Sequence, residues 1–368
     1  MSNEMANKNH DDPNIAFLPK FIRERYDVGW IVAFFKHKEV PVHKHSLWYY
    51  MGGISLFLFL VQIVTGVLLM VHYNAGEAHA SVQAIMSQVD FGWLIRSTHS
   101  WSANLMVFFV FLHMFSVFFM KSYKYPREMT WMTGMILLAM CLGFGFSGYL
   151  LPWDQLAYFA TQIGVKTTEA VPVMGGFIAD MLRGGKELGT QTIERFYALH
   201  VWVLPALFMM TLGLHLLFVQ LQGIHAPEFF ENQPADKKKY MKFFPDFAIK
   251  DVYVWLIVMN FLGLLAVMFP WELGAEADPL APAPAGIKPE WYFLAMFQLL
   301  KLFPPEIGPI EGELFGIMLF SLVGVLWAAI PFIDSRTAPA WRSRATFYFG
   351  IAFLTGFIIF TMWGHYSK

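Results

Sequence analysis

The sequence predicts an all-α integral membrane protein with seven transmembrane helices, the first four forming one bundle and the last three following it. Only 14% of the 368 residues are charged and 57% are hydrophobic, whereas soluble proteins carry about 25% charged residues. Seven stretches also lack Asp, Glu, Lys and Arg over the ~20 residues that a helix needs to cross the hydrocarbon core. These stretches are residues 45–76, 97–120, 129–153, 196–227, 252–271, 314–333 and 345–367.

The loops between these spans predict an orientation. The N-terminal arm and every second loop after it contain 18 Lys and Arg residues, and the remaining loops with the C-terminal end contain 8. Since cytoplasmic loops carry the excess of these residues, we expect the N-terminus inside and the C-terminus outside. The polar start, residues 1–14, lacks the apolar core of a cleaved signal peptide. Residues 15–36 either lie amphipathically along the inner surface or form an ordinary basic loop.

Four histidines lie within the predicted spans: His99 and His113 in the second, His200 and His215 in the fourth. Their spacings of 14 and 15 residues bring each pair to within about 40° and 60° on one helix face, with a rise of about 21–22 Å. Both spans run from the outside inward, so His99 is level with His200 and His113 with His215. Two facing imidazoles at two depths fit two bis-histidine haems.

Hydrogen bonding alone and zinc binding fit these histidines less well. A single buried histidine is usually satisfied by a hydrogen bond, but that does not account for four in matching register. Zinc fits poorly, because two histidines per level leave half of its usual four-ligand shell empty.

Glycines repeat at the same interval as the histidines. Gly52 and Gly66 in the first span, and Gly134 and Gly148 in the third, are each 14 residues apart. Glycine lets an object approach the backbone closely, and a flat macrocycle is such an object, although helix packing in membranes also uses glycine. The single cysteine, Cys141, excludes an internal disulfide, a CxxCH haem attachment site and a cysteine-bound iron–sulfur cluster within the chain.

The chain resembles the cytochrome b subunit of cytochrome bc complexes over almost its whole length. The resemblance rests on the four histidines, the two glycine pairs and several short motifs. It is greatest for the photosynthetic bf-type branch, here with its four-helix and three-helix pieces fused. The motifs are GYLLPWDQ (148–155), LRGG (182–185), RFYALH (195–200) and KPEWYF (288–293).

This resemblance implies that the chain oxidises quinol and sends the two electrons along separate paths. One electron goes to a high-potential external acceptor, and the other crosses two b-type haems to a second quinone site, with proton translocation. It divides the chain into an inner-surface arm (1–45), a four-helix di-haem domain (46–222) and a three-helix quinol-site domain (223–368). The implied partners are a Rieske-type iron–sulfur subunit, a c-type cytochrome and a second copy of the complex, in a bacterial inner membrane.

The resemblance also implies site residues. On the outer side Glu290 would accept a proton from quinol, while Tyr292, Pro289 and Trp291 of the same loop line the pocket opposite Tyr149. A carboxylate among aromatic residues and away from water can have the raised pKa that this task requires.

On the inner side, Lys250 and Asp251 would deliver protons to the second quinone. A helix-start acid complementing the helix dipole, beside a snorkelling lysine, is the alternative. Arg96, three residues before His99, resembles the arginine that pairs with an outer haem propionate.

Three positions depart from the family pattern. Ser116 stands where an arginine often follows the inner ligand, and Gln220 stands where the mitochondrial-type branch has a histidine in the inner quinone pocket. Tyr50 stands where the bf-type branch attaches a third haem through cysteine, so no covalent third haem is expected.

The net charge of −1 gives no indication of nucleic-acid binding. The alternative function is a di-haem b membrane anchor that passes electrons between quinone and a soluble dehydrogenase. Such an anchor needs neither the PEWY loop nor seven helices, and a non-redox transporter would contain no haem at all.

Overall fold

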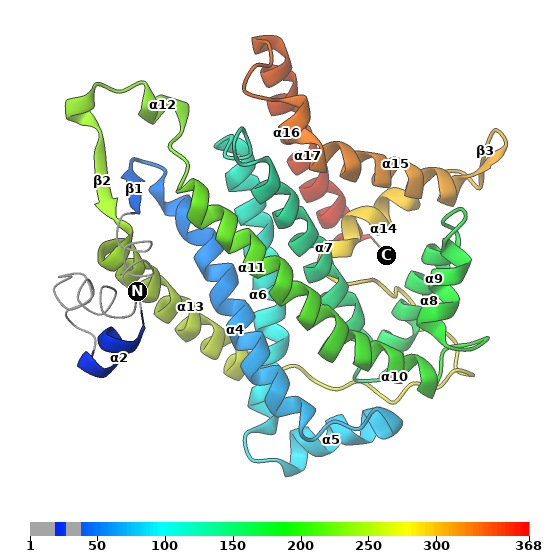
Figure 1. Cartoon of the computed structure of the whole chain (residues 1–368). Coiled ribbons are helices and arrows are strands. Elements are labelled where there is room, and N and C mark those ends of the chain that lie inside the picture. Colours follow the sequence, from blue (N-terminus) through cyan, green and yellow to red (C-terminus); the bar gives the residue numbers. More distant parts are fainter. Residues whose placement is uncertain (1–18, 27–37, 368) are drawn as a thin grey trace.

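The computed structural model describes residues 19–26 and 38–367. Within this part, six helices are long and apolar enough to cross a membrane, and they make the chain an integral membrane protein (Figure 1). They are α4 (Tyr50–Met70), α6 (Gly92–Phe119), α7 (Glu128–Leu150), α10 (Thr190–Ala198) continued by a π turn and α11 (Leu204–Gln222), α13 (Ala248–Met268) and α17 (Ala340–Tyr366).

The span predicted at residues 314–333 is shorter than expected. Helix α15 (Gly312–Ala328) has 17 residues, or about 26 Å at 1.5 Å per residue, against a hydrocarbon core of ~30 Å. It stops before Pro331, which lies in the first turn of the separate short helix α16 (Ile330–Ile333), because proline cannot continue a helix ladder. Seven full-length spans are therefore not found in the described residues.

The helices pack around two apolar cores. The first contains buried side chains from α4, α6, α7 and α11, and also Val258 and Leu262 of α13. The fifth span is thus part of the bundle core, and Ser97 Oγ of α6 donates a hydrogen bond of 3.0 Å to Ala266 O of α13. The second core joins α6 and α7 to α15, α16 and α17 around the buried Trp327.

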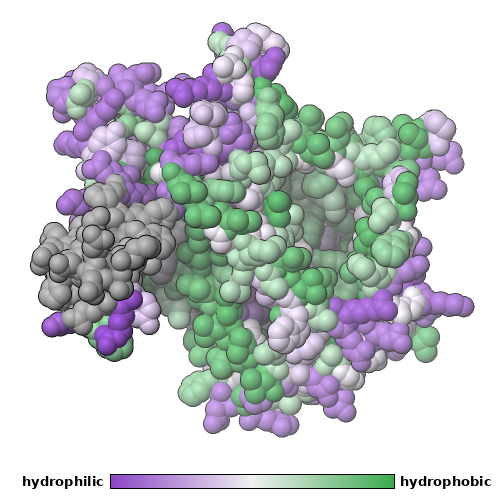
Figure 2. Space-filling model, in the orientation of Figure 1, coloured by the Kyte–Doolittle hydropathy of each residue, from purple (hydrophilic) through white to green (hydrophobic). Residues whose placement is uncertain are grey.

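Short elements cover both ends of the bundle. Those at the outer end, named after the predicted orientation, are α5 (Ala78–Gln88), α8 (Gln155–Glu169), α9 (Gly175–Arg183), the start of α10, and the loop leading to η6 (Trp291–Phe293) and α14 (Leu294–Leu300). At the inner end are α12 (Glu228–Glu231), η4 (Ala235–Lys237) and the strands β1 and β2, and α2 (Lys20–Arg25) precedes β1 in the chain. Figure 2 shows apolar surface across the middle of the molecule and hydrophilic residues towards both ends.

The structure is mostly helical, as predicted, and adds two small antiparallel ladders. Strand β1 (Glu39–Val42) pairs with β2 (Lys239–Lys242), and β3 (Glu306–Ile307) with β4 (Ile310–Glu311). The first ladder ties the segment before α4 to the segment before α13, about 200 residues later. The inner-surface segment predicted at residues 15–36 lies mostly outside the described residues.

Candidate functional site

Two of the predicted histidines face each other between α6 and α10–α11. The rings of His99 and His200 have centroids 6.4 Å apart and an interplanar angle of 71°. The inner histidines, His113 on α6 and His215 on α11, are close enough to interact electrostatically. The structure thus contains two histidine pairs in the order that the spacing predicts.

A π turn reconciles the two spacings. Residues Leu199–Val203, which include His200, form a π turn (η3) between α10 and α11. Such a turn inserts one extra residue into the helix, and π bulges are frequent at functional sites. The 15-residue step from His200 to His215 therefore matches the 14-residue step on α6.

Hydroxyl groups hold three of the four imidazoles. Nδ1 of His99 is 2.8 Å from Thr65 Oγ1, and Nδ1 of His200 is 3.0 Å from Ser147 Oγ. Nδ1 of His215 is likewise 3.0 Å from Thr133 Oγ1. These contacts leave Nε2 of the three rings as the nitrogen available to bind a metal.

Each histidine also lies against one of the four glycines. A Cβ would be 3.3 Å from His99 Cε1 if built on Gly66, and 2.7 Å from His200 Cε1 if built on Gly148. The corresponding distances are 3.1 Å from Gly52 to His113 and 3.4 Å from Gly134 to His215. At Gly148 the imidazole itself occupies the space of a side chain, whereas at the other three glycines a Cβ would make a tight or an ordinary contact with the ring.

The donor set fits haem iron. No group of three or more His, Cys, Asp or Glu that could hold a metal occurs in the described part of the chain. Two facing imidazoles with free Nε2 atoms suit an iron whose other four donors come from a macrocycle. The buried, apolar helices around both pairs suit the macrocycle itself.

The guanidinium of Arg96 is bonded to main-chain carbonyl groups of the loop after α13. It donates 2.6 Å and 3.3 Å hydrogen bonds to the carbonyl oxygens of Trp271 and Glu272, and contacts Met86 Sδ at 3.3 Å. Arg96 is therefore a buried link between α6 and the loop after α13. An arginine has five N–H donors, so these bonds leave capacity for a carboxylate.

The outer loop brings together the predicted quinol-site residues. Tyr292 is buried, and its hydroxyl lies so close to α7 that a Cβ on Gly145 would overlap it. Tyr292 and Tyr149 both interact electrostatically with Glu290. Burial raises the pKa of the Glu290 carboxyl above its usual value. Next to it, Trp291 Nε1 donates a 2.9 Å hydrogen bond to Asn104 Oδ1 of α6.

The inner residues Lys250 and Asp251 are adjacent in sequence but do not pair. Asp251 turns towards α4, where a Cβ on Gly53 would overlap its carboxylate, and its Oδ1 is buried without a hydrogen-bond partner among the described residues. Lys250 is exposed, and its Nζ is 3.9 Å from Met241 Sδ. Neighbouring helical side chains diverge by about 100°, so the two groups face different surroundings, and their role at a quinone site stays a prediction.

A lysine that the sequence did not single out contacts Gln220, one of the residues expected at an inner quinone site. Lys38 Nζ donates to Gln220 Oε1 at 3.1 Å and to Val219 O at 3.3 Å. Burial lowers the pKa of Lys38 to about 8. Strand β1 brings Lys38 to the end of α11, and no local sequence pattern predicts this contact.

Two families of known proteins match most of the chain. The family described as cytochrome b/b6/petB matches residues 35–223, and the family described as cytochrome b (C-terminal)/b6/petD matches residues 276–368. The chain belongs to the cytochrome b/b6 family. It is 50% identical over 338 residues to the "cytochrome bc complex cytochrome b subunit" of Chlorobaculum thiosulfatiphilum, covering 91% of this chain and 78% of that protein.

A further relative and a solved structure match different shares of the chain. The cytochrome b6 of Synechococcus elongatus is 44% identical over 209 residues, which are 56% of this chain and 97% of that protein. The solved structure named "Hyperthermophilic respiratory Complex III" superposes with a TM-score of 0.80 at 26% identity, covering 95% of this chain and 91% of that one.

Within this cytochrome b/b6 chain, the three departures from the family pattern have local partners. Ser116 Oγ donates a 2.8 Å hydrogen bond to His113 O, so its hydroxyl is hydrogen-bonded within α6. Tyr50 stacks on Phe247 with centroids 4.6 Å apart. Gln220 accepts the hydrogen bond from Lys38.

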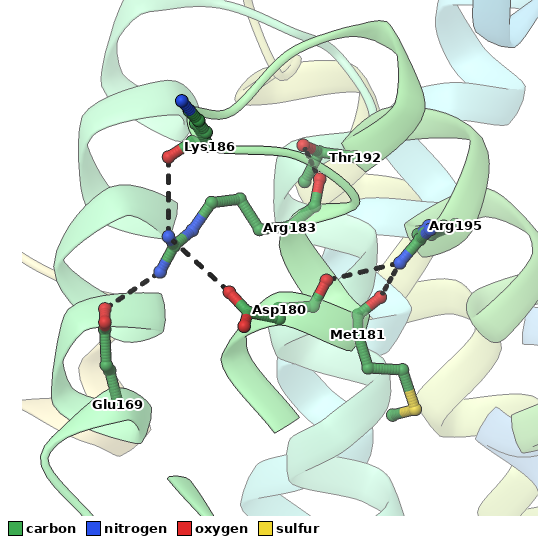
Figure 3. Close-up of polar contacts among 7 residues, drawn as sticks. All are labelled: Glu169, Asp180, Met181, Arg183, Lys186, Thr192 and Arg195. Carbon is green, nitrogen blue, oxygen red and sulfur yellow. Dashed lines mark hydrogen bonds and ion pairs between the residues drawn. The ribbon is translucent and has the colours of Figure 1, made fainter. Parts of the chain in front are cut away.

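The motifs LRGG and RFYALH form a polar cluster at the outer end (Figure 3). Arg183 pairs with Glu169 at 2.8 Å, and Arg195 Nη1 donates to Met181 O at 2.5 Å and Asp180 O at 3.3 Å, at the end of α9. Residues of the cluster line an open cavity of about 510 Å³. Since Arg195 belongs to the helix that continues into the π turn, the cluster fixes the helix that presents His200.

Proposed function

We propose that this chain is the cytochrome b subunit of a quinol-oxidising cytochrome bc complex. The observation that carries the proposal is the pair of histidine levels, each with glycines against the rings. The names of its relatives, a cytochrome bc complex subunit and a respiratory Complex III structure, support the same conclusion.

His99 and His200 would hold an outer b haem, and His113 and His215 an inner one. When bound, the two haems supply one-electron carriers at two depths of the membrane. Thr65, Ser147 and Thr133 fix the ring orientation by accepting the Nδ1–H protons, as hydrogen-bond partners of metal-bound histidines do. Arg96 would have N–H groups left for a propionate of the outer haem.

Quinol would be oxidised where the outer loop meets α7. Glu290, partly buried beside Tyr149 and Tyr292, accepts a quinol proton and can pass it to the outer side. Burial makes this carboxylate a stronger base than an exposed one. Tyr292, Pro289 and Trp291 shape the pocket and keep water from the reacting oxygen.

Quinone would be reduced at the inner end, between α4, α11 and α13. Asp251 is half-buried and faces α4, and its Oδ1 is buried without a hydrogen-bond partner in the described residues, so it can supply a proton. Lys38 and Gln220 form a polar contact near the end of α11, and the exposed Lys250 can replenish protons from the inner solution.

The proposal extends to the assembly and its orientation. A Rieske-type subunit and a c-type cytochrome receive the first electron of each quinol, and two copies of the complex form a dimer. The N-terminus lies inside and the C-terminus outside, with α15 and α16 together making the remaining crossing. Residues 46–222 carry the haems, and residues 223–368 carry most of the quinol site.

Haem analysis of histidine variants tests this function. The purified wild-type complex should contain two b haems per chain by the pyridine haemochrome method, and reduce cytochrome c with quinol. His99→Ala or His200→Ala should remove the outer haem, and His113→Ala or His215→Ala the inner one. His79→Ala, a histidine of the outer surface bonded to Gly274 O, is the control. Two haems retained in a ligand variant would refute the assignment.

A further inference from the structure

The hydroxyl partners of the imidazoles have defined hydrogen-bond directions. Thr65 Oγ1 is 2.7 Å from Val61 O in the preceding turn. When Nε2 of His99 binds iron, as the proposed function requires, Nδ1 carries the ring proton, so Thr65 Oγ1 accepts that proton and donates its own to Val61 O. The 2.8 Å contact between Oγ1 and Nδ1 suits this arrangement.

The two partners on α7 act in the same way. Thr133 Oγ1 lies 3.0 Å from Met129 O, and Ser147 Oγ lies 3.3 Å from Phe144 O. Each hydroxyl thus donates to its own helix and accepts from the facing ring, His215 or His200. Each hydroxyl residue directly precedes a glycine that touches its ring, as Thr65 precedes Gly66.

The fourth ring lacks this partner. Nδ1 of His113 is buried and has no hydrogen-bond partner among the described residues. His113 lies against Gly52, and the residue before Gly52 is Met51, whose thioether is at best a weak acceptor. The outer level thus has two hydrogen-bonded imidazoles, and the inner level has one.

We propose that positions 65 and 51 set the two haem levels at different reduction potentials. This inference rests on the proposed function, since it requires haem at both levels. A hydrogen bond from Nδ1–H increases the basicity of the ligand, and a more basic ligand stabilises the ferric state. Thr65 therefore lowers the potential of the outer level, whereas Met51 leaves the inner level easier to reduce. The difference directs electrons from the outer level to the inner one.

Two pairs of variants test this assignment. Met51→Thr supplies an acceptor beside His113, and Met51→Val makes a similar change of shape without the hydroxyl. Thr65→Val removes the acceptor beside His99, and Thr65→Ser keeps it. The midpoint potential and the electron paramagnetic resonance g-values of each haem are measured by redox titration of the purified complex.

The expected shifts have opposite signs. The inner potential should be lower in Met51→Thr than in Met51→Val, and the outer potential higher in Thr65→Val than in Thr65→Ser. Each shift should reach about tenfold in the oxidised-to-reduced ratio, which is about 59 mV for a one-electron couple. The haem at the other level should not change.

The possible outcomes distinguish a failure of this inference from a failure of the proposed function on which it rests. Equal potentials within either pair, with two haems present, would overturn the inference and leave the histidine ligands in place. Should Met51→Thr not assemble, the Thr65 pair decides alone, because Thr65→Val exchanges one hydroxyl for a methyl group of similar size and Thr65→Ser keeps that hydroxyl. A wild-type complex with fewer than two b haems would instead refute the proposed function.

Discussion

The imidazole of His200 lies against the backbone of Gly148, and a Cβ built there would be 2.7 Å from the ring's Cε1. Real Cβ atoms do not approach other atoms so closely. The ring is also held by Ser147, the residue before the glycine. The ring of His200 therefore fills the space that a side chain at position 148 would need, and no residue type other than glycine fits there without moving that ring.

Replacing Gly148 by Ala should displace His200 and reduce the content of the outer haem. The added methyl group forces the ring away from Ser147 and tilts its Nε2. Gly213→Ala, on the same helix as His215, is a matched control because nothing lies within 4 Å of its added Cβ. Pyridine haemochrome analysis should find two haems per chain in the control and about one in Gly148→Ala. Two haems in both proteins would contradict the steric argument.

Replacing Glu290 by Gln should slow quinol oxidation by about tenfold or more, since general-base contributions reach ~10²–10⁴-fold. Only the deprotonated carboxylate accepts a proton, and burial raises its pKa, so the wild-type rate should rise with pH through this raised pKa. The amide variant should lack that rise while both haem spectra stay intact. Glu306→Gln, at an exposed position of β3, should behave as wild type. Unchanged turnover and an unchanged pH profile in Glu290→Gln would show that this loop shapes the pocket without accepting the proton.

Replacing Asp251 by Asn should slow the reoxidation of the inner haem and leave its reduction from the outer site fast. Quinone reduction consumes protons, and an amide cannot supply them. Asp246→Asn, an exposed acid five residues earlier, controls for the loss of charge near the inner surface. Stopped-flow spectroscopy of the inner haem measures both steps. Equal reoxidation in the two variants would make Asp251 a structural residue.

Replacing Asp334 by Ala should destabilise the protein by about 3–5 kcal/mol, the usual effect of removing one partner of a buried ion pair. Asp334 is fully buried, 3.0 Å from Lys124 Nζ and 2.6 Å from Tyr123 OH. Asp180→Ala is the control, because that carboxylate is 76% exposed and only 3.9 Å from Arg183, a surface pair worth about 0–1 kcal/mol. Thermal unfolding in detergent compares them. A Tm shift no larger in Asp334→Ala than in the control would show that the contacts of Asp334 with Lys124 and Tyr123 do not stabilise the protein.

Several site features can be predicted from the sequence because they repeat along single helices. The 14-residue intervals of His99–His113, Gly52–Gly66 and Gly134–Gly148 are read from the sequence. Helix geometry alone then places both members of each pair on nearly the same face of one helix, because 14 residues make almost four full turns. The hydroxyl residue before Gly66, Gly134 and Gly148 is equally visible in the sequence, but sequence reasoning missed its role because that role depends on the ring from another helix.

Other features depend on contacts between distant segments. The Lys38–Gln220 contact joins residues 182 positions apart, and the Tyr123–Asp334 bond joins residues 211 positions apart. The divergence of Lys250 and Asp251 is local in the sequence, but only the position of α4 decides that the acid faces a helix and the lysine faces outward.

The sequence by itself determined that the chain crosses a membrane and that four histidines lie at two depths, because hydropathy and helical period are properties of one helix at a time. The tertiary structure alone decided which atoms meet. The π turn at Leu199–Val203 absorbs the extra residue before His215, and α13 joins the core beside α6. Three imidazoles thereby gain a hydroxyl partner, whereas His113 has none among the described residues. Such pairings depend on how separate helices pack, and no local pattern encodes them.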